Sequence, residues 1–164
     1  MVETAVKELE VLAVDEQQFL TFKMGEDEYG VDILAVQEIH IWEEPRPMPN
    51  TPDYIRGVID WRGTIVPIID LRVRFQYPEA TYTDKTVVII LQTKITGTDQ
   101  NCIIGVVVDA VADVFDVKAE DLKKAPSLGS AIDTKYIKGM TKIENSMIII
   151  LDIEKLINLQ ELTS

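Results

Sequence analysis

One short pattern occurs twice in this chain, and it constrains the fold more than any other feature. Tyr54-Ile55-Arg56-Gly57 returns as Tyr136-Ile137-Lys138-Gly139, at an offset of 82 residues (136 − 54). The same offset pairs Ile65 with Met147, Ile69 with Leu151, and Asp70 with Asp152. Chance similarity between β-branched runs is the weaker explanation, because the spacing stays constant over chemically different residues. We therefore interpret the chain as two copies of one β unit.

A second alignment extends the duplication toward the N-terminus. Gly30-Val31-Asp32-Ile33 aligns with Gly105-Val106-Val107-Val108 at an offset of 75 residues (105 − 30). A gap of seven residues (82 − 75) in the intervening loop reconciles the two offsets. Either copy alone would bury too little surface to be a stable independent domain. Two copies packed together share a core and leave a groove where they meet, and such grooves are common binding sites.

Short β-branched and aromatic runs alternate with turn residues along most of the chain. Phe19–Phe22 and Tyr29–Val31 flank a Gly-containing turn and predict a hairpin, and Asp32 is placed to cap a short helix. Four prolines between Glu44 and Asp53 exclude regular structure there. Further strands are predicted at Val58–Ile59, Ile65–Val66, Ile68–Ile69, Thr86–Leu91, Cys102–Val108, Val114–Val117 and Met147–Leu151. This pattern favours a small-barrel β protein.

The charge balance excludes two classes of partner. The 164 residues carry a formal net charge of −12, with 16 basic residues scattered among 28 acidic ones. Nucleic-acid binding needs clustered Lys and Arg, and an anionic membrane surface repels such a charge. No apolar run reaches the length of a membrane span, and the first residues lack the pattern of a signal peptide. We expect a cytoplasmic protein that binds no nucleic acid and does not insert into a membrane.

Residues that could carry chemistry are few. His40 and Cys102 are the only histidine and cysteine, which is too few for a zinc site, and the chain has no G-x-S-x-G, P-loop or G-x-G-x-x-G motif. Asp70 and Asp152 each end an apolar run, as a receiver phosphoacceptor does, but a receiver also needs alternating amphipathic helices. We interpret both as strand-end or helix-cap residues, and we expect no enzyme activity, no metal and no cofactor.

The segment from residue 50 to residue 72 is the most specific motif of the chain. It resembles the signature of the CheW family of chemotaxis coupling proteins, which runs roughly N-x-P-x-x-I-x-G-x-x-N-x-R-G-x-x-x-P-x-x-D-L-R. Residues 28–39 resemble the preceding block of that family, and Val106–Asp109 and Ile153–Leu156 resemble later ones. The similarity covers Phe19 to about Leu159. One departure is Asp60-Trp61, where the family usually has Asn-Leu.

The resemblance implies a mainly β fold of two pseudo-symmetric, five-stranded SH3-like β-barrels with short helices. The expected organisation is a helical or mobile arm over residues 1–16 and one CheW-like domain over 17–160. Its approximate halves are 17–82 and 83–160, and an interleaved arrangement of the two is left open. The implied function is a non-enzymatic scaffold that couples chemoreceptors to the CheA histidine kinase. A coupling protein of a related pathway, in surface motility or development, is the alternative.

Partners and contact residues also come from the resemblance. The implied partners are the tip of the receptor's cytoplasmic hairpin and the regulatory domain of CheA, which would recruit the protein to membrane-associated receptor arrays. Glu38 and Arg62 match family positions associated with partner binding, and one interpretation is an intramolecular ion pair that holds the site in shape. The remaining candidates are neighbouring binding positions, Val36, Ile39 and Gly57, and residues that would line the groove, Val87, Val88 and Val108. Each valine is equally well explained as barrel core.

Overall fold

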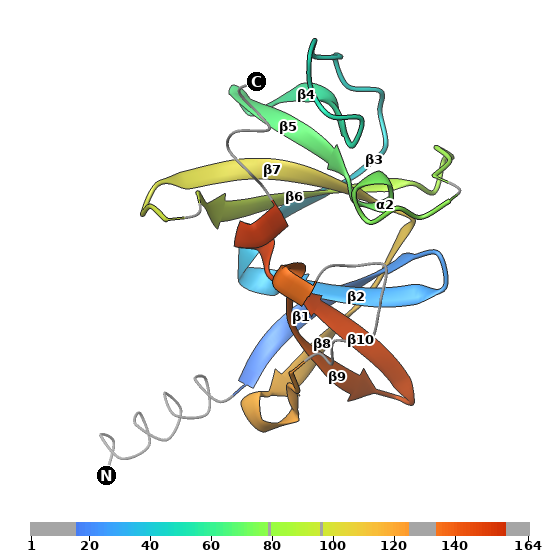
Figure 1. Ribbon diagram of the computed structural model, residues 1–164, viewed down its shortest axis with the longest axis vertical. Helices are drawn as coiled ribbons and strands as arrows, with labels where there is room; N and C mark the ends of the chain where they lie inside the picture. The colour runs from blue at the N-terminus through green and yellow to red at the C-terminus, as the bar shows by residue number, and fades with distance from the viewer. Residues whose placement is uncertain (1–15, 79, 96, 125–133, 157–164) are drawn as a thin grey trace.

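Ten strands in the described part of the chain form two five-stranded sheets, which lie one above the other in the computed structural model (Figure 1). The structure describes residues 16–78, 80–95, 97–124 and 134–156. We call the sheet that holds both ends of the described chain the terminal sheet. Its order is β8-β1-β2-β10-β9, with β1 Glu16–Met24, β2 Asp27–Asp32, β8 Ala110–Lys118, β9 Ile137–Ile143 and β10 Ser146–Leu151. The other we call the central sheet. Its order is β3-β6-β7-β5-β4, with β3 Val36–Ile41, β4 Ile55–Trp61, β5 Thr64–Asp70, β6 Val87–Lys94 and β7 Asn101–Val108.

Helices are short and lie at strand ends. Among the described residues, none is long and apolar enough to cross a membrane. The described residues include the α-helix α2, Leu71–Arg74, and the 3-10 helices η1 Ile33–Ala35, η2 Ala119–Asp121, η3 Thr134–Tyr136 and η4 Ile153–Leu156. Asp32 accepts a hydrogen bond from the backbone N–H of Leu34 at the start of η1, as the sequence predicts. The prediction of a mainly β protein with two five-stranded units and short helices is therefore confirmed.

The two sheets have the same strand order when their strands are matched through the repeat. Tyr54 precedes β4 and Tyr136 precedes β9, and the carbonyl of each accepts a hydrogen bond from the backbone N–H of the matching aspartate. The N···O distances are 2.7 Å for Asp70 and 2.9 Å for Asp152. The same match relates the parallel pairs β5–β7 and β10–β2, in which Ile68 lies opposite Gly105 and Ile150 opposite Gly30. Both offsets of the repeat thus correspond to equivalent strands.

The terminal sheet takes its strands from both sides of the segment that forms the central sheet. The central sheet is built from the continuous stretch 36–108, whereas the terminal sheet joins residues 16–32 to residues 110–151. The boundary between the sheets therefore does not follow the halves 17–82 and 83–160. Of the arm predicted over residues 1–16, only Glu16 is described, as the first residue of β1, and the rest lies outside the described residues.

The sheets are curled but not closed into rings. In each sheet, an isolated bridge pairs one edge strand with the segment that follows the other edge strand. Arg46, after β3, pairs with Val58 of β4, and Lys123, after β8, pairs with Met140 of β9. A glycine precedes the bridged strand residue in both places. At Gly57, whose φ is +142°, a Cβ would lie 2.2 Å from the carbonyl oxygen of Arg46. This contact explains why the repeated motif ends in glycine.

Equivalent hairpins close on turns of the same kind. Arg62 and Gly63 have φ of 52° and 82° between β4 and β5, and Glu144 and Asn145 have φ of 49° and 68° between β9 and β10. Two positive φ angles in a two-residue loop are the signature of a type I′ turn, which suits the twist of the flanking strands. The prediction of a tight turn with Arg62 at its tip is confirmed, since this side chain is 71% exposed.

Pro67 lies inside β5, although the sequence places it between two strands. Proline has no backbone N–H to donate to a neighbouring strand, and on the side of β7 no such hydrogen bond is required here. The parallel pairing of β5 with β7 covers only Ile68 to Asp70, so Pro67 has a ladder partner in β4 alone. It therefore occupies an edge-like stretch, where proline is tolerated in sheets.

Buried side chains form three clusters. One lies inside the central sheet and includes Val66, Ile68 and Val88, and one lies inside the terminal sheet and includes Phe19 and Ile150. The largest cluster takes side chains from both sheets, so the contact between the units is itself the main core. Its fully buried members include Phe22, Met24, Tyr29, Val31, Leu71, Ile89, Leu91, Ile104, Val106 and Val108.

Candidate functional site

Glu38 is the centre of a polar cluster on the surface of the central sheet. It lies on β3, where half-buried and exposed residues alternate, so that Glu38 and His40 share one face and Ile39 and Ile41 the other. Strands β3 and β4 are the opposite edges of the sheet order, and the curl of the sheet brings them together. Trp61 at the end of β4 therefore reaches Glu38.

One carboxylate oxygen of Glu38, Oε2, receives three contacts. The indole Nε1 of Trp61 donates a hydrogen bond of 2.5 Å, the Nε2 of His40 lies at 3.0 Å, and an Nη2 of Arg62 lies at 3.9 Å. The Trp61 hydrogen bond is the largest cause that lowers the pKa of Glu38, and the charges of His40 and Arg62 add to it. Glu38 is thus held as an anion in a fixed orientation.

Arg62 completes the cluster from the turn tip. Its guanidinium carbon lies 4.8 Å from the centre of the Trp61 ring, within cation–π range. Glu38 and Arg62 therefore lie close together, as the resemblance implies. They meet through one long contact and not through a bidentate pair. Trp61, the main partner of Glu38, is not among the contact residues predicted from the sequence. The signal that pointed to this position was the departure of Asp60-Trp61 from the family pattern.

The other predicted contact residues occupy different environments. Ile39 is 45% exposed, whereas Val36 and Val87 are half-buried at the margin of the large core. Val88 is buried and lines a surface pocket. Two residues have no contact surface. Gly57 lies beneath the backbone of Arg46, and Val108 is fully buried in the core shared by the two sheets.

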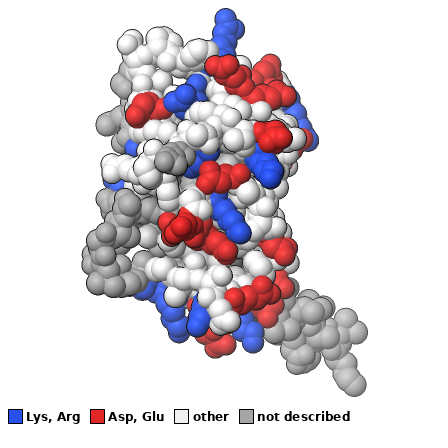
Figure 2. Space-filling model, turned by 90° about the vertical axis from the view of Figure 1, so that its right-hand side faces the viewer, with Lys and Arg blue, Asp and Glu red and all other residues white. Residues whose placement is uncertain are grey.

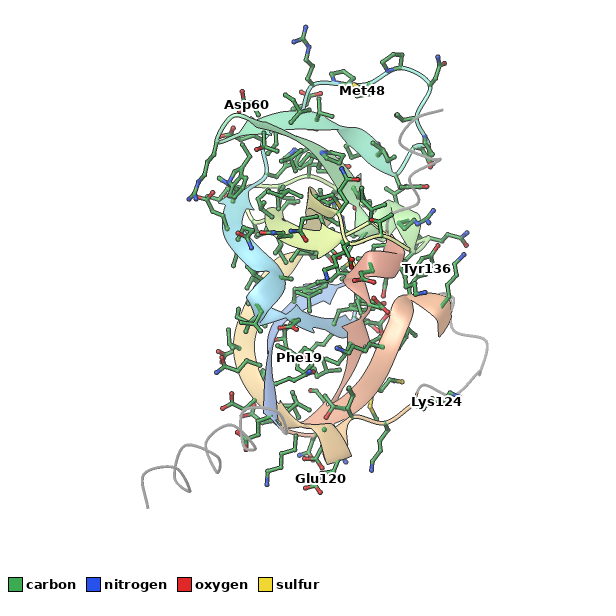
Figure 3. All side chains as sticks on the ribbon, turned by 90° about the vertical axis from the view of Figure 1, so that its left-hand side faces the viewer. Phe19, Met48, Asp60, Glu120, Lys124 and Tyr136 are labelled. Atoms are coloured by element: carbon green, nitrogen blue, oxygen red, sulfur yellow. The ribbon has the colours of Figure 1, made fainter. Side chains whose placement is uncertain are left out.

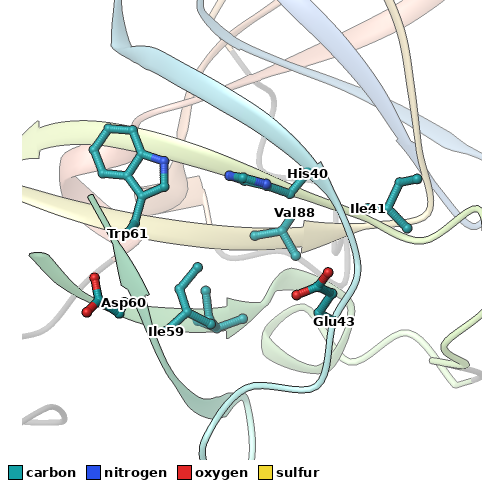
Figure 4. A pocket seen from close by; sticks show the side chains of 8 residues that line it. His40, Ile41, Glu43, Ile59, Asp60, Trp61 and Val88 are labelled. Atoms are coloured by element: carbon teal, nitrogen blue, oxygen red, sulfur yellow. The ribbon is translucent and has the colours of Figure 1, made fainter. Parts of the chain in front are cut away.

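The pocket lies next to the Glu38 cluster (Figure 4). Its volume is about 150 Å³, and its lining comes from β3, β4, β5 and β6 and the residues after β3. The residues that line it are His40, Ile41, Glu43, Ile59, Asp60, Trp61, Ile68 and Val88. Apolar and acidic groups thus meet at one opening beside the cluster.

Exposed apolar side chains gather in the same segment of the chain. Leu34 is 86% exposed and Ile41 is 68% exposed, with Ile39 between them. Exposed apolar side chains in one region are typical of protein-contact surfaces. Acidic and basic side chains are interspersed over the face shown in Figure 2, and no metal-binding group of three or more His, Cys, Asp or Glu occurs in the part of the chain that the structure describes. The arrangement therefore suits binding of another protein.

Comparisons with known proteins identify the family and agree with this fold. Residues 18–161 match the family described as the CheW-like domain. The chain is 42% identical to the chemotaxis protein CheW of Klebsiella aerogenes over 146 residues, which is 89% of this chain and 84% of that protein. It is 35% identical to the chemotaxis protein CheW of Treponema pallidum over 153 residues, 92% of this chain and 89% of that protein.

A solved structure has the same architecture. The crystal structure of the scaffolding protein TtCheW from Thermoanaerobacter tengcongensis matches with a TM-score of 0.75 and 32% sequence identity. The match covers 87% of this chain and 88% of that chain. The match therefore supports the two-sheet architecture described above.

Proposed function

The chain belongs to the CheW family of chemotaxis scaffold proteins, and from this premise we propose that it couples chemoreceptors to the CheA histidine kinase by binding both. The observation that carries the proposal is the fixed Glu38 carboxylate on one face of the edge strand β3, with Ile39 and Ile41 exposed on the other face of the same strand. A rigid charged group next to apolar side chains gives a protein interface both orientation and contact area. Membrane-associated receptor arrays are then the place where the protein acts.

The proposed contact surface comprises Glu38, Ile39 and Arg62, with the half-buried Val36 and Val87 at its margin. Gly57 supports it indirectly, because it lets the Arg46 segment close the sheet against β4. Val88 takes part through the pocket that it lines. We leave Val108 out of the contact surface, because a side chain with no exposed area can contact a partner only after the core rearranges.

Binding alone accounts for this function. The Glu38 carboxylate is occupied by neighbouring donors, and the Asp70 carboxylate accepts from Arg72 and Tyr82. We therefore propose that the chain regulates the kinase without turning over a substrate. Incubation with phosphorylated kinase should leave no phosphate on the chain, and stable labelling of Asp70 or His40 would contradict this.

The test is a sedimentation experiment with three purified components. Receptor-containing membranes should bring down the kinase when this chain is present and leave it in solution when the chain is absent. Glu38→Lys should reduce the sedimented kinase with little change in melting temperature, since surface charge pairs add little to folding. Glu120→Lys is the matched control, because Glu120 lies at the opposite end of the molecule (Figure 3). Kinase that sediments equally without the chain would refute the coupling role.

A further inference from the structure

The pocket beside Glu38 is too small for the usual kind of ligand. Small-molecule sites typically have volumes of roughly 300–1,000 Å³, whereas this pocket has about 150 Å³. Its inner lining is apolar and comes from Ile59, Ile68 and Val88, the last two of which are almost fully buried. The space therefore suits a single inserted side chain with an apolar stem.

The opening of the pocket is acidic. Glu43 and Asp60 lie on opposite sides of it, with Ile59 and Val88 between them (Figure 4), and both are exposed. In the described part of the chain neither carboxylate takes part in an ion pair, and one oxygen of Asp60 accepts a hydrogen bond from the backbone N–H of Gly63 at 2.9 Å. Arg62, two residues after Asp60, is directed at Glu38 and at the Trp61 ring. An incoming cation would thus meet two carboxylates at the mouth of an apolar pocket.

We propose that this pocket receives an arginine side chain presented by a partner protein. Its aliphatic stem would pack against Ile59, Ile68 and Val88, and its guanidinium would pair with Glu43 and Asp60. The inference rests on the proposed function, because it identifies one contact of the partner that the same surface binds. It also goes beyond that function, since it specifies the chemistry of a single anchoring residue.

Arginine fits better than the other candidate side chains. Leucine or methionine would fill the apolar space but leave the acidic opening without a counter-charge. Lysine offers a point charge that is strongly hydrated, whereas the planar guanidinium loses less hydration and can donate to two carboxylates at once. Arginine is also enriched in the central anchors of protein interfaces. The Trp61 ring, already close to the Arg62 guanidinium, provides a wall compatible with a second one.

An NMR titration of the isotope-labelled full chain tests the proposal without any partner protein. The probes are the amides of N-acetyl-arginine, N-acetyl-citrulline, N-acetyl-lysine and N-acetyl-norleucine. Citrulline has nearly the shape of arginine but no charge. The arginine probe should shift the Val88 methyl signals and the Trp61 indole signal at lower concentration than lysine, and citrulline and norleucine should shift them least. Glu43→Gln should weaken arginine binding by up to about fivefold, the effect expected of a partly exposed ion pair, and Glu120→Gln should not.

Three results would overturn the inference. They are equal shifts from citrulline and arginine, stronger shifts from norleucine, and arginine shifts confined to residues outside the pocket. Because the titration needs neither receptor nor kinase, its failure is separable from failure of the proposed function. Kinase coupling with no arginine effect would refute the anchor alone, and arginine binding without coupling would leave the pocket assignment in place.

Discussion

Three side chains converge on one oxygen of Glu38, and the shortest contact comes from Trp61. Trp61→Phe keeps an aromatic ring beside Arg62 but removes the N–H donor. We expect the pKa of Glu38 to rise toward its ordinary value, because the main cause of its lowering is then absent. A pKa below that of the unfolded chain contributes stability above the unfolded pKa, and this contribution is lost as pH falls through the folded pKa. The difference in unfolding free energy between wild type and variant should therefore be largest near neutral pH and should disappear in acid.

The carboxyl ¹³C shift of Glu38, followed against pH, measures the first effect, and urea unfolding at several pH values measures the second. Trp42→Phe is the matched control. Trp42 stacks on Tyr82 with ring centroids 4.2 Å apart, and no contact of it with Glu38 is among those that shift this pKa. A pKa of Glu38 that is unchanged by Trp61→Phe would show that the indole hydrogen bond does not hold this carboxylate.

Arg72 and Asp70 are the two buried charged residues of the described structure. Its Nε and Nη2 donate to the two oxygens of Asp70 at 3.0 Å each, and its Nη1 donates to Asp109 at 3.0 Å and to the carbonyl of Thr81 at 2.7 Å. Because the Asp70 side chain has no exposed area, Arg72→Ala leaves a buried carboxylate without its counter-charge. We expect a loss of about 3–5 kcal/mol in the free energy of unfolding, measured with urea.

Lys138→Ala is the control for this variant, since it removes an exposed basic side chain and should cost less than about 0.5 kcal/mol. Arg72→Lys should also destabilise, because an ammonium cannot reproduce the forked contact with Asp70. If Arg72→Ala cost no more than Lys138→Ala, the buried network would contribute nothing to stability.

At the residue scale, the sequence predicts which residues of the two repeats are equivalent better than it predicts which side chains touch. Constant spacing identifies Tyr54 and Tyr136 as equivalent, and their carbonyls do make matching hydrogen bonds. The contact between Trp61 and Glu38 joins residues 23 positions apart on opposite edges of a curled sheet. No periodic pattern encodes such a contact, because it depends on how far the sheet curls.

At the scale of elements, the closing bridge of the central sheet depends on Gly57. A Cβ there would overlap the Arg46 carbonyl, and the φ of +142° is unfavourable for any other residue. Gly57→Ala should therefore cost at least about 2 kcal/mol and break the bridge between Arg46 and Val58. Urea unfolding gives the cost, and hydrogen exchange of the Arg46 and Val58 amides reports the bridge.

Two other glycines separate the causes of this effect. Gly63→Ala tests backbone strain alone, because Gly63 has a φ of +82° and nothing within 4 Å of an added Cβ. Its cost should be about 1 kcal/mol. Gly139→Ala tests close approach alone, since an added Cβ would lie 2.8 Å from a side-chain atom of Leu122 and 3.0 Å from the carbonyl oxygen of Lys123. A loss for Gly57→Ala no greater than for Gly63→Ala would show that strain, and not the bridge, determines the cost.

The elements themselves are largely predictable, and their long-range pairing is not. Alternation and turn residues identify the hairpin of β1 and β2 and the short cap at Asp32. The parallel pairing of β2 with β10 joins residues near opposite ends of the chain, and nothing local in either strand specifies that partner. The alignment of Gly30 with Gly105 does mark β2 and β7 as equivalent strands, but equivalence does not identify what each one pairs with.

At the scale of the whole molecule, the largest core belongs to neither sheet alone. Two units that share their main core should unfold together. Leu91→Ala truncates a fully buried side chain of the shared core, and we expect it to lower the free energy of unfolding by about 2–5 kcal/mol. Ile150→Ala truncates a fully buried side chain of the cluster inside the terminal sheet, and it should lower the same global stability. Native-state hydrogen exchange should show both variants accelerating the slowest amides of both sheets, by the factor that each change in unfolding free energy specifies. Faster exchange confined to the terminal sheet in Ile150→Ala would contradict this, because it would mean that the two sheets unfold independently despite the core between them.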